Sequence, residues 1–123
     1  MKYSDAQRIE KICTMTEKLL NYLRTSNITE EIIVGNEPIR WAITTPLYNI
    51  GEHAYCLSDN FKAAYNQIPW NRISSLRHRL VHDYDNTSWS TICSVIFEVL
   101  PVFYDELKEV DKTLRENKGD NIS

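Results

Sequence analysis

Apolar side chains recur every three or four residues along most of this sequence, a spacing typical of helices that bury one face. The two-residue alternation of a half-buried strand is absent, and glycine occurs only as Gly35, Gly51 and Gly119. A chain of 123 residues fits one compact domain. The sequence therefore predicts an all-α, up-down helical bundle over residues 1–115, followed by a polar tail over residues 116–123.

Residues that favour helix starts divide the pattern into four main helices. These span about residues 4–25, 36–57, 69–83 and 89–114. Ser58 is expected to cap a short further helix. Pro46 and Pro101 should bend the second and fourth helices, because proline lacks a backbone donor and crowds the preceding turn. Gly51, inside the second helix, is best explained by the close approach of a neighbouring helix.

Charge, hydropathy and cysteine content indicate the cellular compartment of the protein. A formal net charge of -3 argues against a protein that coats nucleic acid through bulk electrostatics. The most apolar stretch, residues 92–104, is interrupted by Glu98 and Pro101 and falls short of a membrane span. Three cysteines without framework spacing favour buried free thiols in a reducing compartment: Cys13, Cys56 and Cys93. We therefore expect a cytoplasmic protein without membrane contact.

One stretch of the chain is unusually cationic. Residues 72–84 read R-I-S-S-L-R-H-R-L-V-H-D-Y, and between positions 71 and 82 they contain three arginines, two histidines and no acid. Within an acidic chain this is a local cationic patch suited to a phosphate group.

Helix geometry limits how the residues of this patch can cooperate. At about 100° per residue, Arg77 and His82 point about 140° apart on a straight helix. They can converge if the helix ends between them, or if a cleft between two subunits collects both. Arg77 also flanks the apolar stripe through Ile73 and Val81, so that its stem should be packed and its charged head positioned.

Two other interpretations of this stretch are possible. The arginines can be solvated or paired surface charges, with Arg79 and Asp83 as an i, i+4 pair and His82 interacting with the helix dipole. Alternatively, His78 and His82 are spaced as a pair of metal ligands that Asp83 or Asp85 could complete. Arginines on both sides of His78 disfavour a divalent cation, so we expect no metal.

Several motifs in this sequence resemble those of a known family. Arg77-x4-His82-x-Tyr84 resembles the R-x4-H-x-Y signature of HepT-like proteins in the HEPN superfamily. The resemblance extends to the segments Ile50-Gly51-Glu52, Ile68-Pro69-Trp70, Leu80-Val81-His82 and Leu100-Pro101. Where the family usually has asparagine after the arginine, this chain has His78.

The resemblance implies the toxin subunit of a toxin–antitoxin system. Such a toxin is a metal-independent, homodimeric endoribonuclease whose RNA substrate meets Arg77 and His82 in a shared cleft, with His78 as a possible auxiliary group. Its partner would be a minimal nucleotidyltransferase antitoxin that neutralises it by AMPylation, with Tyr84 as the AMP acceptor. The alternative is a non-catalytic helical module that binds phosphate or nucleotide groups beside a nucleotidyltransferase; a purely structural helical dimer is a third possibility.

Overall fold

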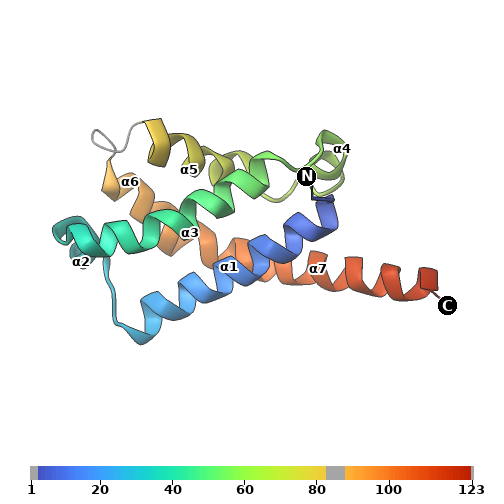
Figure 1. The fold of residues 1–123 in the computed structure, drawn as a ribbon, viewed down its shortest axis with the longest axis horizontal. Coiled ribbons are helices and arrows are strands. Elements are labelled where there is room, and N and C mark those ends of the chain that lie inside the picture. Colours follow the sequence, from blue (N-terminus) through green and yellow to red (C-terminus); the bar gives the residue numbers. More distant parts are fainter. Residues whose placement is uncertain (1–2, 83–87, 123) are drawn as a thin grey trace.

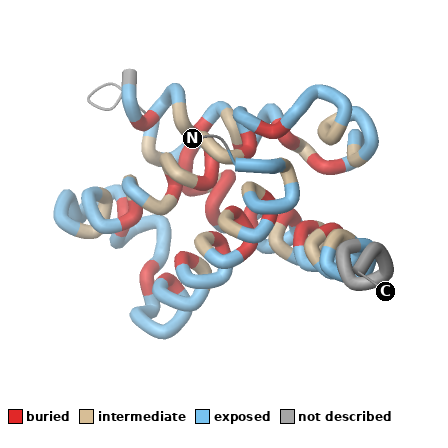
Figure 2. Tube along the Cα trace, turned by 45° about the vertical axis from the view of Figure 1, so that its right-hand side comes forward, coloured by how far each residue is buried: buried red, intermediate tan, exposed pale blue. Residues whose placement is uncertain are grey.

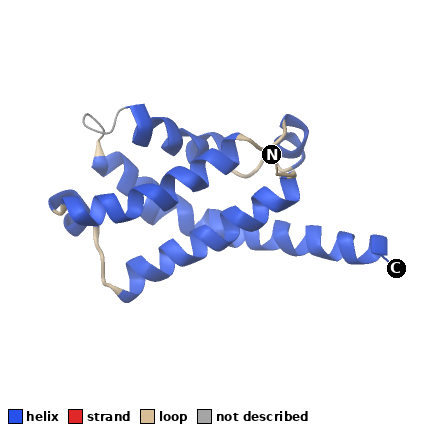
Figure 3. Cartoon of the chain, in the orientation of Figure 1, coloured by secondary structure: helices blue, strands red, loops and turns tan. Residues whose placement is uncertain are grey.

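The computed structural model describes residues 3–82 and 88–122, with side chains for residues 3–81 and 88–117. Every regular element within those ranges is helical (Figure 3), which confirms the expected all-α bundle. The helices are α1 (Asp5–Thr25), α2 (Glu30–Gly35), α3 (Glu37–Tyr55), α4 (Asp59–Ala64), α5 (Trp70–His82), α6 (Trp89–Ser94) and α7 (Leu100–Ile122), with a π-helical turn over Val95–Val99.

Capping residues fix where the helices begin, as the sequence predicts. At α1, Ser4 and Gln7 form a capping box, in which the Gln7 amide donates to Ser4 Oγ at 3.1 Å and the Ser4 amide to Gln7 Oε1 at 2.8 Å. Asn36 caps α3 by accepting from the Ile39 amide, and Ser58 caps α4. The short helix α2 is not anticipated by the periodicity, because six residues give less than two turns of pattern.

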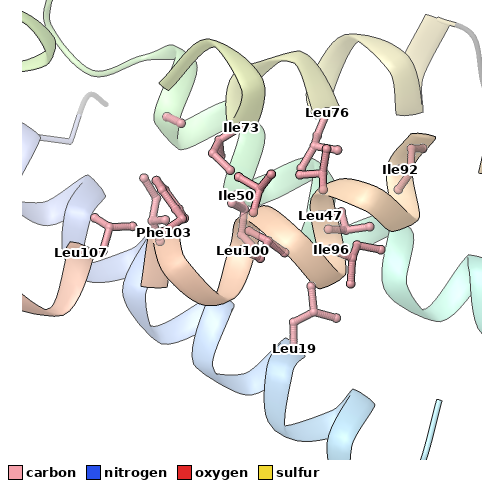
Figure 4. Packing of buried hydrophobic residues seen from close by; sticks show 14 of the residues in the cluster. Leu19, Leu47, Ile50, Ile73, Leu76, Ile92, Ile96, Leu100, Phe103 and Leu107 are labelled. Carbon is pink, nitrogen blue, oxygen red and sulfur yellow. The ribbon is translucent and has the colours of Figure 1, made fainter. Parts of the chain in front are cut away.

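The long helices pack side by side around one core. α3 lies between α5 and α1, and α7 crosses α1 and continues beyond the other helices toward the C-terminus (Figure 1). Buried residues line the inner faces of the helices, and exposed residues line the outer faces (Figure 2). The close view of the core shows side chains from α1, α3, α5, α6 and α7 in contact (Figure 4), among them Leu19, Leu47, Ile50, Ile73, Leu76, Ile92, Ile96, Leu100 and Phe103.

The two prolines are accommodated without breaking a helix. α3 is continuous through Pro46. α6, the π-helical turn and α7 form one uninterrupted helix, in which the Leu100 amide donates to the Val95 carbonyl immediately before Pro101. The widened turn is the local adjustment at a residue that crowds the preceding turn and lacks a backbone donor.

Burial corrects two details of the sequence interpretation. All three cysteines are free, but Cys56 is exposed rather than buried. Burial raises the pKa of the Cys13 and Cys93 thiols to about 11, so neither is a reactive thiolate near neutral pH. Val81, which was assigned to the apolar stripe of α5, is 54% exposed. Across the described part of the chain, no helix combines the length and apolar character that crossing a membrane requires.

Candidate functional site

The predicted site residues are distributed over the end of α5 and the segment after it. Arg77 and His78 lie within α5, where His78 is exposed. His82 is the last residue of α5, and its side chain lies outside the described residues, as does the whole of Tyr84. The convergence of Arg77 and His82 therefore stays a prediction, whereas the surroundings of Arg77 are defined.

Gly51 lets α3 and α5 approach each other at Arg77. A Cβ atom on Gly51 would lie 2.8 Å from the Arg77 backbone nitrogen, 3.1 Å from the Ile73 carbonyl oxygen and 3.2 Å from the Arg77 Cβ. Two of these atoms belong to the backbone and cannot move aside without displacing the helix. The prediction that Gly51 reflects close helix packing is confirmed, and the neighbour is the segment that carries Arg77.

The same contact brings an acid to the cationic patch. Arg77 Nε donates a short hydrogen bond to Glu52 Oε1, and the two side chains, 33% and 35% exposed, form an ion pair. The hydrogen bond to Glu52 is the main cause of a raised pKa for Arg77. Residues 71–82 contain no acid, but the fold supplies one from α3. Arg77 is thus held by a residue 25 positions away in the sequence.

The Tyr55 ring lies against the same guanidinium. The Arg77 Cζ atom lies 4.2 Å from the centre of the Tyr55 ring, within the range of a cation–π contact. Glu52 accepts from Nε–H, so the guanidinium edge that lies between the two terminal amino groups is not the edge that faces this carboxylate. This geometry suits an arginine that binds the oxygens of a phosphate group.

Large apolar side chains are exposed on the outer faces of α3 and α5. Trp41 is 58% exposed, Tyr55 54% and Val81 54%. Trp41 and Tyr55 are fourteen residues apart on α3 and so lie on the same side of the helix. The Arg77 guanidinium beside the exposed Tyr55 ring is a surface suited to contact with another molecule.

A metal centre finds no defined ligand set in this region. Within the side chains of residues 3–81 and 88–117, no three His, Cys, Asp or Glu residues are placed to hold a metal ion. The alternative site on His78 also needs His82 with Asp83 or Asp85, and these three side chains lie outside the described residues.

Sequence reasoning identified Arg77 but not the two residues that hold it. Glu52 was part of a family-like motif without an assigned role, and Tyr55 was not singled out. The available signal was the spacing on α3, since Glu52 and Tyr55, three apart, lie on one side of the helix next to Gly51. What the sequence could not supply was the facing residue on α5.

Comparison with known proteins identifies the family. The family model described as ribonuclease HepT-like matches residues 6–110, which include the Gly51 contact, the Arg77–Glu52 pair and the end of α5. The chain belongs to the ribonuclease HepT-like family. It is therefore related to ribonucleases of this family through most of its length.

Individual relatives carry names of the same kind. A protein of Methanocaldococcus jannaschii named "Putative RNase" is 24% identical over 97 residues, which is 79% of this chain and 78% of that protein. A "Putative RNase" of Caldanaerobacter subterraneus is 26% identical, over 71% of this chain and 78% of that protein. The "Probable ribonuclease HepT" of Thermococcus cleftensis is 23% identical, over 91% of this chain and its own full length. No solved structure matches the chain significantly.

Proposed function

We propose that this protein is the toxin of a toxin–antitoxin system and cleaves RNA without a metal ion, with Arg77 and His82 as catalytic residues. The observation that carries the proposal is the arrangement of Arg77. In a chain of the ribonuclease HepT-like family, the fold holds this arginine between Glu52 and Tyr55 at the surface.

The chemistry follows from the 2'-hydroxyl group of RNA. A base removes its proton, the 2'-oxygen attacks the adjacent phosphorus, and the bond to the 5'-oxygen breaks, leaving a 2',3'-cyclic phosphate and a 5'-hydroxyl end. His82 acts on these protons, because an imidazole exchanges protons near neutral pH. Arg77 donates to the phosphate oxygens as negative charge develops on them. His78, one residue after Arg77, is an auxiliary donor to the leaving oxygen.

The active form in this proposal is a homodimer. Arg77 and His82 lie five residues apart on α5, a separation of about 140° on a regular helix. A second subunit packed on the exposed Trp41, Tyr55 and Val81 would cover apolar surface and bring two copies of α5 to one cleft. This cleft would then combine residues of both subunits.

Cleavage of RNA in the presence of EDTA tests this function. We expect the wild-type protein, purified without a partner, to cut single-stranded RNA equally well with and without EDTA and to leave 2',3'-cyclic phosphate ends. His82→Ala should abolish cleavage while the helical circular-dichroism spectrum is retained. A wild-type protein that binds RNA but cuts none would instead support the non-catalytic phosphate-binding module.

Regulation by the partner is part of the same proposal. We place the AMP acceptor at Tyr84, two residues after His82 and between two aspartates in the sequence. A nucleotide attached there by a minimal nucleotidyltransferase would bring a negative phosphodiester close to the catalytic residues and exclude the RNA phosphate.

Co-expression with the partner tests the acceptor. Tyr84→Phe should remain an active toxin and escape neutralisation, because only the acceptor oxygen is lost. Mass spectrometry of the wild-type complex should show added AMP on the peptide that contains Tyr84. A neutralised complex in which Tyr84 is unmodified would contradict this mechanism and favour simple occlusion of the cleft by the partner.

A further inference from the structure

One side of α1 carries cations and no acids. Arg8, Lys11 and Lys18 follow one another at three and seven residues, so they share a side of the helix that also includes Met15 and Tyr22. Of the acids of α1, Asp5 and Glu17 are bonded to other helices, and Glu10 borders this side. In a chain with a net charge of -3, three cations on one side of a helix form a distinct surface.

Specific contacts turn two of these acids away from that side. Asp5 accepts from the amide and the hydroxyl of Ser58, at 2.9 and 2.7 Å, at the start of α4. Glu17 accepts from the Tyr104 hydroxyl on α7 at 2.8 Å. The charge separation around α1 is therefore part of how the helix is packed.

The cationic side of α1 faces α3 across an open groove. The groove has a volume of about 410 Å³ and is lined by Tyr3, Glu10, Lys11, Thr14, Met15, Lys18, Asn49 and His53. Glu10 is the one acid in this lining. Lys11 and Lys18 lie about 10 Å apart along the helix, a separation that suits an extended polyanion better than a single small anion.

His53 on α3 lines this groove, and its hydrogen bond to Arg8 fixes which ring nitrogen carries the proton. An Arg8 terminal amino group lies 3.1 Å from His53 Nδ1. Because arginine can only donate, Nδ1 must accept, and the proton of the neutral ring lies on Nε2. Partial burial, followed by the charges of Arg8 and Lys11, lowers the pKa of His53 and favours this neutral form.

Tyr3 fixes the charged groups at one end of the groove. Lys11 Nζ lies 4.6 Å and Arg8 Cζ 5.6 Å from the centre of its ring, and the His53 ring meets it edge-on at 5.7 Å. The heads of Arg8 and Lys11 are therefore positioned before any ligand arrives, which reduces the entropy lost on binding.

We propose that the groove between α1 and α3 binds the phosphate backbone of the RNA strand beside the point of cleavage, with Lys11, Lys18 and His53 as contacts. This inference rests on the proposed ribonuclease function. His53 is adjacent in sequence to Glu52, which holds Arg77, so α3 connects the groove to the catalytic arginine. An RNA strand lying across α3 would pass from the Arg77 phosphate to the phosphates over α1.

Comparing a long with a minimal substrate tests the groove. Lys11→Gln together with Lys18→Gln should raise KM for a long single-stranded RNA on the order of tenfold and leave kcat unchanged. Cleavage of a dinucleotide, too short to reach α1, should be unaffected. The matched control is Lys108→Gln with Lys112→Gln, which removes two exposed charges from α7 and should change neither substrate.

Binding measurements separate the contact from the chemistry. In a His82→Ala background, Lys11→Gln with Lys18→Gln should reduce the steepness of log RNA affinity against log salt concentration by about 0.7 for each lost contact. Lys18→Glu alone, at an exposed position outside the Tyr3 contacts, should weaken binding in the same direction. Lys11→Arg with Lys18→Arg should restore wild-type KM, because the charges are kept.

The outcomes distinguish this inference from the proposed function. If wild-type protein cuts RNA and the lysine variant behaves like the α7 control, the groove proposal is wrong and the ribonuclease stands. If the lysines are needed to bind RNA that is never cut, the groove stands and the ribonuclease is wrong. Loss of dinucleotide cleavage, or loss of partner binding with RNA binding intact, would overturn the groove; absence of both RNA binding and cleavage would overturn both proposals.

Discussion

The contacts α3–α5 and α1–α7 use polar groups at the surface in different ways. Across α3–α5, Arg77 is bonded to Glu52 of the other helix and stacked on Tyr55. Across α1–α7, the bond is from the neutral Tyr104 hydroxyl to Glu17, at 2.8 Å. The arginine of α7, Arg115, is instead bonded within its own helix.

Arg115 is held in position by its own helix, whereas Arg77 is held by contacts between two helices. Arg115 Nε donates to Asp111 Oδ2 at 2.9 Å, four residues earlier, and the Arg115 side chain is 65% exposed. Any helix with this sequence could form that pair. Arg77 keeps its position only while α3 and α5 are in contact at Gly51, and its side chain is 33% exposed. An arginine held by tertiary contacts has a defined direction, as binding a phosphate in the transition state requires.

The largest difference is expected when the arginines themselves are changed. Arg77→Lys keeps the charge but loses the planar fork, so RNA cleavage should fall by about 100-fold or more, as on loss of an oxyanion donor. Arg115→Lys should leave cleavage unchanged. The rates of RNA cleavage by the two variants give the comparison, and equal rates would mean that Arg77 is only a surface charge.

Neutralising the carboxylates that bind the two arginines should give the next largest difference in RNA cleavage. Glu52→Gln leaves a neutral acceptor, and Arg77 is then held less firmly, so kcat should fall about tenfold to 100-fold with a much smaller change in KM. Asp111→Asn should not affect either constant. If KM rises instead and kcat is unchanged, Glu52 affects substrate binding rather than the direction of Arg77.

Adding a side chain at Gly51, where α3 and α5 meet, should lower the free energy of unfolding. The methyl group of Gly51→Ala overlaps α5 backbone atoms, at a cost of about 1–3 kcal/mol that exceeds the gain in helix propensity of about 1 kcal/mol. Gly35→Ala is the matched control, because no atom lies within 4 Å of the added Cβ, and it should be neutral or slightly stabilising. Urea unfolding measures both, and a stabilised Gly51→Ala protein would contradict the close approach of α3 and α5.

The smallest effect on stability is expected from removing the hydrogen bond between Tyr104 of α7 and Glu17 of α1. The hydrogen bond to Glu17 raises the pKa of Tyr104 to about 12. The contribution of this hydrogen bond to the free energy of unfolding is therefore fully present below the pKa of Tyr104 in the unfolded chain, which is near 10. It is lost as the pH rises through the folded-state pKa of about 12. Tyr104→Phe should cost about 1 kcal/mol or less at neutral pH. Unfolding at about pH 8 and about pH 11 should show the difference between wild type and variant shrinking; a constant difference would exclude the hydrogen bond as its cause.

Some features of this protein are present in the sequence because they depend on neighbours along the chain. The spacing of apolar residues set the number and faces of the long helices, and Ser4, Asn36 and Ser58 marked starts that the structure confirms. Local sequence also pointed to Arg77 as a cation with a packed stem. These results hold because capping and helical periodicity act over three or four residues.

Other features required two helices to meet. Val81 fits the apolar stripe of α5 but is exposed, because no described helix covers that side at the end of α5. Arg77 acquires its partner Glu52 and the Tyr55 ring only when Gly51 admits the backbone of α5. The sequence by itself determined the helices and the cationic segment, whereas the tertiary structure decided which acid and which ring hold the arginine, since a contact between distant residues depends on how whole helices pack.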